Sequence, residues 1–309
     1  MALQDLIKKR IDRLETIPEN LKTVIDRENE VLFKKILEQL NRLEVKEGKI
    51  VTSKSNLAII ASIIDELKGT LFGGEYVDAI KQFAVEIETQ AKLNNQILSA
   101  TVGSFEDNEL YRNTILKAQQ NALLLMDENA VSSNFLQPLQ ELLTTATISG
   151  ISYTDAVEML RSNMVGENAI FSKYAGQIVK DTFAVSDRQY VQLTARLHGI
   201  EFYKYDGGKV EDTREFCLER AGKVFHEKEI EAWGNFKKTR AEFIRPKYLY
   251  ETKAGVKIYW EGMNYDTNSA TIKSYLGGYN CLHVLVPIAT EYVSSTDKAR
   301  AKELGFFAG

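Results

Sequence analysis

Residues 274–288 read SYLGGYNCLHVLVPI, and this stretch decides how the C-terminal part of the chain is interpreted. A Gly-Gly pair precedes Cys281 and His283, and an apolar, β-branched run typical of a strand follows them. The 309 residues contain two cysteines and three histidines, so this pair draws on scarce residue types. The other cysteine, Cys217, and a second histidine, His226, precede it in the same part of the chain. We therefore expect Cys217 and Cys281 to share one small core.

These four residues supply the thiolate and imidazole groups that zinc prefers as ligands. Their spacing is not that of a zinc finger, because Cys217 has no cysteine two residues away. In a strand, Cys281 and His283 would project from the same face. Two interpretations stay open: a zinc site made of Cys217, Cys281, His283 and His226, or reduced cysteines that pack as small apolar side chains without any cofactor.

A cluster of charged residues surrounds Cys217 in residues 211–220, EDTREFCLER. Its candidates for acid/base chemistry, with His226 or His283 nearby in space, are Asp212, Arg214, Glu215 and Glu219. Asp212 followed by Thr213 is also typical of a helix cap. No nucleophile and base stand at a recognisable spacing, and Gly207-Gly208-Lys209 is too short for a phosphate-binding loop. The sequence therefore predicts that the protein is not an enzyme.

Residues 237–257 are locally basic in a chain whose formal net charge is −4. They hold seven basic and two acidic residues, a local charge of +5, interleaved with aromatic side chains. Such a pattern suits a surface that neutralises phosphates and stacks on bases, and it equally suits a solvated hairpin with its aromatic residues on the core. On the first interpretation the DNA-contacting residues are Lys237, Lys238, Arg240, Arg245 and Lys247.

The composition, with 44% apolar and 27% charged residues, is that of a soluble globular protein of two domains. No run approaches the roughly 18 apolar residues of a membrane span. The charged, amphipathic start has no secretory h-region, so we expect folding in a cytoplasm, where thiols stay reduced.

Through residue 198 apolar residues recur every three or four positions, which predicts successive helices. Pro18 is expected to separate two of them, and separate helices are expected over 174–183 and 186–198. After Gly199 the pattern changes to strands at 200–208, 256–260 and 283–288, with one short helix at 226–234. The predicted fold class is α+β, a long mostly helical region followed by a small compact mixed α/β domain. The predicted domains are 1–198, 199–292 and a C-terminal tail, 293–309.

The order YDGG, DTREFC, GKVF, W, WEG and YLGGYNCLHVLVPI resembles the C-terminal domain of phage head morphogenesis proteins, the Mu F-type minor head proteins. The resemblance covers about residues 170–290. Leu282 stands where the family commonly has arginine, and residues 237–257 read as an insertion. The matching residues are Asp212, Thr213, Arg214, Cys217, Gly222, Lys223, Trp260, Gly262, Gly277, Gly278, Asn280, Cys281, His283 and Pro287.

The resemblance implies a minor structural protein of a tailed-phage particle, present in several copies and acting in head assembly or in genome packaging and delivery. It implies the portal protein and the major capsid protein as partners, assembly in the host cytoplasm, residence in the head or neck of the virion, and no membrane. The basic stretch would add genomic DNA as a partner. The alternatives are a zinc-dependent hydrolase or nuclease using Cys217, Cys281 and His283, and a generic DNA-binding adaptor without portal contact.

Overall fold

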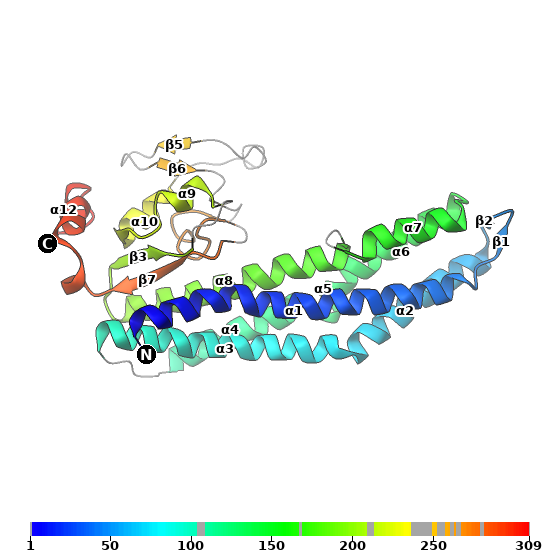
Figure 1. Cartoon of the computed structure of the whole chain (residues 1–309), viewed down its shortest axis with the longest axis horizontal. Helices are drawn as coiled ribbons and strands as arrows, with labels where there is room; N and C mark the ends of the chain where they lie inside the picture. The colour runs from blue at the N-terminus through cyan, green and yellow to red at the C-terminus, as the bar shows by residue number, and fades with distance from the viewer. Residues whose placement is uncertain are drawn as a thin grey trace. The chain divides into compact units, whose positions relative to one another are not determined.

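The computed structural model describes residues 2–103, 109–166, 169–208, 213–235, 249–251, 257–259, 263, 267–278 and 281–308. The protein is α+β, with long helices up to Leu197 and a few small antiparallel sheets (Figure 1). The N-terminal elements are α1 (Leu3–Leu40), β1 (Val45–Lys46), β2 (Lys49–Ile50), α2 (Lys54–Gly73), α3 (Glu75–Val102), α4 (Glu109–Leu125), α5 (Glu128–Val131), the π-helical turn η1 (Ser132–Leu136), α6 (Gln137–Ile148), α7 (Tyr153–Met164) and α8 (Ile170–Leu197).

Four of the C-terminal elements match strands and a helix that the sequence predicts. The elements predicted at residues 200–208, 226–234, 256–260 and 283–288 correspond to β3, α10, β6 and β7, respectively. The elements are β3 (Phe202–Asp206), α9 (Glu215–Leu218), β4 (Val224–His226), α10 (Glu227–Trp233), β5 (Leu249–Glu251), β6 (Lys257–Tyr259), β7 (Val284–Ile288), the 3₁₀ turn η3 (Thr290–Tyr292) and α12 (Ser295–Glu303).

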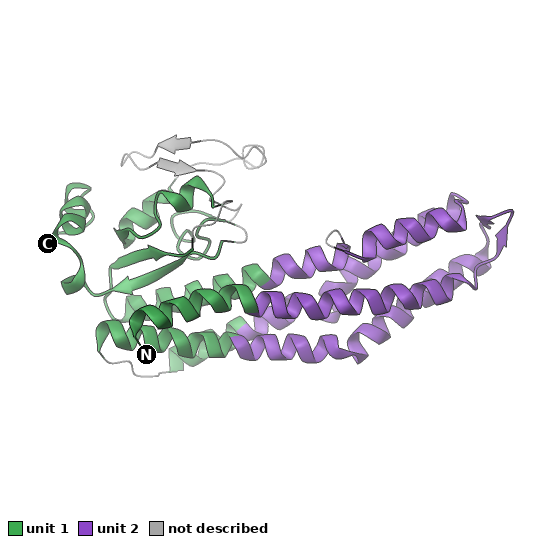
Figure 2. Ribbon diagram, in the orientation of Figure 1, with its two compact units in different colours: residues 1–16, 87–118, 180–309 green, residues 17–86, 119–179 purple. Residues whose placement is uncertain are grey.

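The chain forms two compact units (Figure 2). Unit 1 contains residues 1–16, 87–118 and 180–309, and unit 2 contains residues 17–86 and 119–179. Helices α1, α3, α4 and α8 contribute residues to both. The mixed C-terminal part therefore shares a unit with the ends of four helices. The predicted limits 1–198, 199–292 and 293–309 follow the change in secondary structure and remain a prediction.

The helix break predicted at Pro18 is wrong, because α1 continues through this proline from Leu3 to Leu40. A proline inside a helix costs about 3 kcal/mol, since it removes a hydrogen bond and crowds the preceding turn. Buried residues on both sides of it, Leu14 and Leu21, are 1% and 4% exposed. The apolar stripe packs along the whole helix and offsets the local cost.

The break predicted before Ser186 is also wrong, because α8 is one helix from Ile170 to Leu197. Ser186 and Asp187 resemble a helix start in the sequence, but the Asp187 carboxylate has other partners. It accepts hydrogen bonds from Arg10 at 2.6 Å, from Gln90 at 2.9 Å and from Asn94 at 2.8 Å. Asp187 is thus a buried tertiary contact and not a cap.

The sheet of unit 1 has the order β4-β3-β7, and all its neighbours are antiparallel. Central strand β3 alternates its side chains between two cores. Tyr203 and Tyr205 join a large cluster with Phe216 and Trp233, whereas Phe202 packs in a smaller cluster on the other side. Tyr205 lies opposite Leu285 of β7 in the register. This pairing brings the residues just before β7 next to the end of β3.

We predict that Asp187→Asn lowers the free energy of unfolding by about 3–5 kcal/mol at neutral pH, because Arg10 loses its buried counter-charge. Burial raises the pKa of Asp187, but the charge and hydrogen bonds of Arg10, with Asn94 and Gln90, hold it below the ordinary value. The stabilisation is present above the unfolded-state pKa of about 3.9 and is lost as the pH falls through the folded-state pKa. Urea unfolding followed by the fluorescence of buried Trp233 reports it.

Asp78→Asn is the matched control, because the Asp78 side chain is 88% exposed. It should leave both the stability and its dependence on acid pH unchanged within about 0.5 kcal/mol. If Asp187→Asn changes the free energy of unfolding at pH 7 by no more than about 0.5 kcal/mol, the stabilising role of the Arg10–Asp187 pair is contradicted.

Candidate functional site

Cys217 is held in place by the short helix α9, which is fixed to the Gly-Gly turn of residues 277–278. The N-cap residue Arg214 donates a hydrogen bond from Nη1 to the carbonyl oxygen of Gly277 at 2.8 Å. Cys217 is only 2% exposed, and its neighbour Phe216 lies fully inside the same core. The sulfur of Cys217 therefore faces the turn that the sequence singles out.

Cys281 and His283 complete a cluster with Cys217. They precede β7 directly, and they are 5% and 7% exposed. The two sulfur atoms and a ring nitrogen of His283 all lie within 4.8 Å of one another. Both cysteines are free thiols. The structure thus brings together three of the four residues that the sequence offered as metal ligands, across more than sixty positions of chain.

Tyr205, which the sequence interpretation did not include, is the fourth member of this cluster. Its hydroxyl group donates to Cys217 Sγ at 3.2 Å and lies 4.0 Å from Cys281 Sγ. Its ring centroid lies 5.2 Å from that of His283. The alternation of β3 carries the signal for this residue, because it places Tyr203 and Tyr205 on the face opposite to Phe202.

The first glycine of the turn is required by the two sulfur atoms. Gly277 has φ of +64°, and a Cβ at this position would lie 2.4 Å from Cys281 Sγ and 2.9 Å from Cys217 Sγ. Gly207 leaves room in the same way for the imidazole, since a Cβ there would lie 2.6 Å from Cδ2 of His283. Gly277 and Gly207 therefore allow the backbone to approach the cluster closely.

Buried Arg188 of α8 holds the segment that carries Cys281 and His283. Its guanidinium group donates to the carbonyl oxygens of Ser274 at 3.1 Å, of His283 at 3.0 Å and of Cys281. Among the residues that the structure describes, no carboxylate pairs with it. An irregular loop leaves its carbonyl groups without ladder partners, and this one side chain satisfies three of them.

The two thiols have pKa values that are shifted in opposite directions. A hydrogen bond from Cys217 holds the pKa of Cys281 well below the ordinary cysteine value, and His283 and the positive charge of Arg188 act in the same direction against burial. The same hydrogen bond and burial raise the pKa of the Cys217 thiol. Burial also raises the pKa of Tyr205. Of the two thiols, Cys281 is therefore the more acidic.

His226 does not join the cluster, so this part of the predicted ligand set needs correction. His226 pairs with Phe202 across β3 and β4, which places it on the opposite face of the sheet from Tyr205. Its Nδ1 accepts a hydrogen bond from the backbone of Lys228 and caps α10, a capping box with Glu229. Burial lowers the pKa of His226. This histidine is a neutral capping residue.

The other candidate groups do not form an acid/base site within the described residues. Arg214 is the N-cap of α9, the position the sequence interpretation gave to Asp212, and Glu219 lies 3.6 Å from Arg220 in an ion pair. Asp212 falls outside the described residues. So do all five residues predicted to contact DNA: Lys237, Lys238, Arg240, Arg245 and Lys247.

Comparison with protein-family models, with curated proteins and with solved structures found no match. Among the described residues, no helix combines the length and apolar character that a membrane crossing requires. The atoms of the cluster themselves indicate its chemistry. Two thiols, an imidazole and a phenol in a buried space are suited to bind a thiophilic metal ion or to exchange protons, and metal binding would fall to Cys217, Cys281 and His283.

We predict that Arg188→Lys destabilises the protein by about 3 kcal/mol, because one ammonium group cannot reach the three carbonyl oxygens that the guanidinium group satisfies. Urea unfolding monitored by Trp233 fluorescence measures the change. Arg42→Lys is the control, since Arg42 is exposed and its guanidinium group bonds to the nearby Gln39 side chain. Equal stability of the two variants would show that Arg188 does not hold the loop.

We predict that Gly277→Ala lowers the free energy of unfolding by more than about 3 kcal/mol, because the added Cβ is strained at a positive φ and overlaps two sulfur atoms. Gly222→Ala is the matched control: φ is +86° there, but nothing lies within 4 Å of the added Cβ. The control should cost about 1 kcal/mol, which is the backbone contribution alone. Thermal unfolding separates the two, and similar melting temperatures for both variants would exclude the sulfur overlap.

Proposed function

We propose that the protein is a non-catalytic minor head protein of a tailed phage, acting in head assembly or in genome packaging and delivery. One observation carries the proposal: residues that define the resemblance to Mu F-type domains contact one another although they are far apart in sequence. Arg214 bonds to Gly277, and Gly277 lies against both Cys217 and Cys281. A spacing pattern whose members meet in one core has a structural reason, which supports the resemblance.

The accessibility of the cluster favours a structural role over catalysis. An active site exposes its reacting groups to a substrate, usually in a concave pocket. Cys217, Cys281 and His283 are instead 2%, 5% and 7% exposed, packed among Tyr205, Phe216 and Trp233. The zinc-dependent hydrolase and the nuclease are accordingly the less favoured alternatives.

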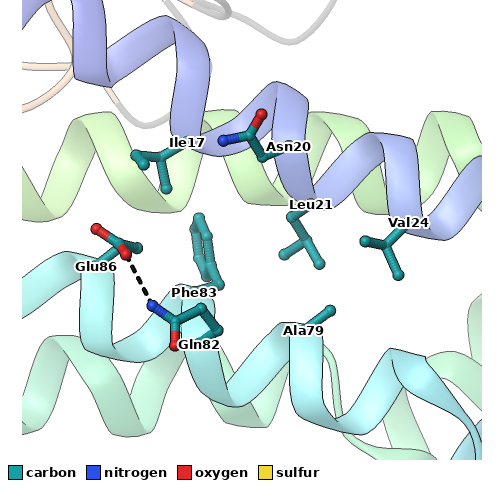
Figure 3. Close-up of a pocket in the computed structure, with 8 residues that line it drawn as sticks. All are labelled: Ile17, Asn20, Leu21, Val24, Ala79, Gln82, Phe83 and Glu86. Carbon is teal, nitrogen blue, oxygen red and sulfur yellow. Dashed lines mark hydrogen bonds between the residues drawn. The ribbon is translucent and has the colours of Figure 1, made fainter.

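The helical region is proposed to dock on the portal protein or on another copy of the chain. In unit 2 a groove of about 180 Å³ lies between α1 and α3, with Leu21, Val24 and Phe83 among its apolar walls (Figure 3). Glu86 and Gln82 form a hydrogen bond at its edge. Large apolar side chains are also exposed on the helices of unit 2: Val31, Val85, Leu124 and Ile148. Apolar helix surface of this kind suits helix-in-groove binding.

The remaining parts of the proposal concern location and partners. The protein assembles in the host cytoplasm and resides in the head or neck of the virion, in several copies, next to the portal protein and the major capsid protein. The mixed C-terminal part lies near packaged DNA, with residues 237–257 as its phosphate-facing edge. This last step has its support in the sequence alone. A DNA-binding adaptor without portal contact is the competing proposal.

Co-expression with the portal protein of the same phage tests the proposal. We expect the full-length chain to co-purify with portal rings through size-exclusion chromatography. The double variant Val85→Glu/Leu124→Glu should weaken this association at least about tenfold, because each buried aliphatic side chain contributes about 1.5–3 kcal/mol. Both residues are exposed, at 50% and 64%, so the chain should fold normally.

Gln120→Glu is the control, because it adds a charge to an exposed position of the same helix α4. It should bind the portal like the wild type. Absence of the wild-type chain from the portal fraction would refute the proposed portal contact. Salt-sensitive retention of DNA in its place would favour the adaptor.

A further inference from the structure

We propose that Cys217, Cys281, His283 and Tyr205 bind one zinc ion in an enclosed, structural site. The proposal does not depend on the phage role, because it rests on four donor atoms inside unit 1. Cys217 belongs to α9, Tyr205 belongs to β3, and Cys281 and His283 precede β7. A single ion would therefore fasten three separate segments of the small C-terminal core.

The distances between the donor atoms suit a tetrahedral ion. Zinc with bonds of about 2.3 Å to sulfur and 2.0–2.1 Å to nitrogen or oxygen separates neighbouring ligand atoms by about 3.3–3.8 Å. Cys281 Sγ lies 3.8 Å from Nδ1 of His283. The Tyr205 oxygen lies 3.2 Å from Cys217 Sγ and 4.0 Å from Cys281 Sγ. These distances, with both sulfur atoms and a ring nitrogen of His283 within 4.8 Å of one another, are compatible with one ion bound by the two thiols, Nδ1 and the phenol oxygen.

The burial of the site and its charge balance both favour a bound zinc ion. Two thiolates and a neutral imidazole would neutralise the divalent ion, and Tyr205 would ligate as the phenolate after losing its proton. The loaded site would then carry one negative charge, which the nearby guanidinium group of Arg188 offsets. A zinc ion would also supply a bonding partner for the imidazole. Nδ1 of His283, the nitrogen that would bind the ion, has only the Cys281 sulfur at 3.8 Å among the described residues. A normal hydrogen bond to that nitrogen would be shorter.

The position of Tyr205 distinguishes this site from a catalytic one. A catalytic zinc ion keeps one coordination position open for water or substrate, whereas a structural ion is enclosed by protein ligands. The phenol oxygen, within 4.0 Å of both sulfur atoms, would be the fourth ligand, and its ring packs on His283. The site therefore stabilises the fold and does not activate water. Soft sulfur donors select zinc over magnesium or calcium.

Metal content and cobalt substitution test the proposal on the full-length chain. Protein purified from zinc-supplemented medium should contain about one zinc ion per chain by mass spectrometry. Exchange for Co²⁺ should produce a thiolate-to-cobalt charge-transfer absorption. Cys217→Ser and Cys281→Ser should abolish that absorption. Tyr205→Phe should retain the ion on three ligands but weaken zinc affinity by at least roughly tenfold, because loss of a ligand should cost no less than loss of a group that only supports one.

His226→Gln is the control, because His226 is a buried histidine on the other face of the sheet. It should bind zinc like the wild type. If a cysteine variant fails to fold, the wild-type protein provides the test. A mercurial that modifies both thiols should release the zinc ion, and a chelator should lower the melting temperature. The proposal is overturned if folded wild-type chain equilibrated with Zn²⁺ binds none. It is also overturned if its two cysteines form a disulfide or if folded Cys217→Ser keeps the ion.

Discussion

A buried guanidinium group, that of Arg188, is the interaction on which the C-terminal core of unit 1 depends. Burying a positive charge is costly unless strong hydrogen bonds compensate it. Here the carbonyl oxygens of Ser274, Cys281 and His283 compensate it, and all belong to a segment with little regular structure. One turn of α8 thereby fixes the loop that delivers two members of the cluster. Asp187, the residue before Arg188, fixes α1 to α8 through its ion pair with Arg10.

Arg10 connects these two sets of contacts. Its guanidinium group pairs with Asp187 and also donates to the carbonyl oxygen of Leu285 at 3.1 Å. Leu285 lies opposite Tyr205 in the sheet, so the same strand register that receives Arg10 places the phenol beside the sulfur atoms. Helix ends, sheet and cluster in unit 1 are thus coupled through a few buried polar groups. This coupling is consistent with a rigid module.

The proposed functions rest on different parts of this arrangement. A docking role in a phage head needs a stable small core and apolar helix surface, and it needs no accessible reactive group. An enclosed zinc site would add stability where the core is small and interrupted by loops, because an ion that binds only the folded chain shifts the folding equilibrium. Either conclusion can fail without the other, since portal binding and metal binding involve different surfaces and residues.

Local pattern in the sequence determined the α+β class, the strand at β3, the helix α10, and the expectation that Cys217 and Cys281 share a core. Periodicity and turn residues act within a few positions, so these features can be read from neighbours alone. Tertiary structure decided the continuity of α1 through Pro18 and of α8 through Asp187. It also decided the face of the sheet on which His226 lies and the buried contacts of Arg188 and Tyr205. Asp187, Arg188 and Tyr205 depend on partners that lie 12 to 177 positions away in the sequence, and no local pattern records which buried group a polar side chain will meet. The capping partners of His226 are local, but its pairing with Phe202 in the sheet places it on the face away from the two sulfur atoms.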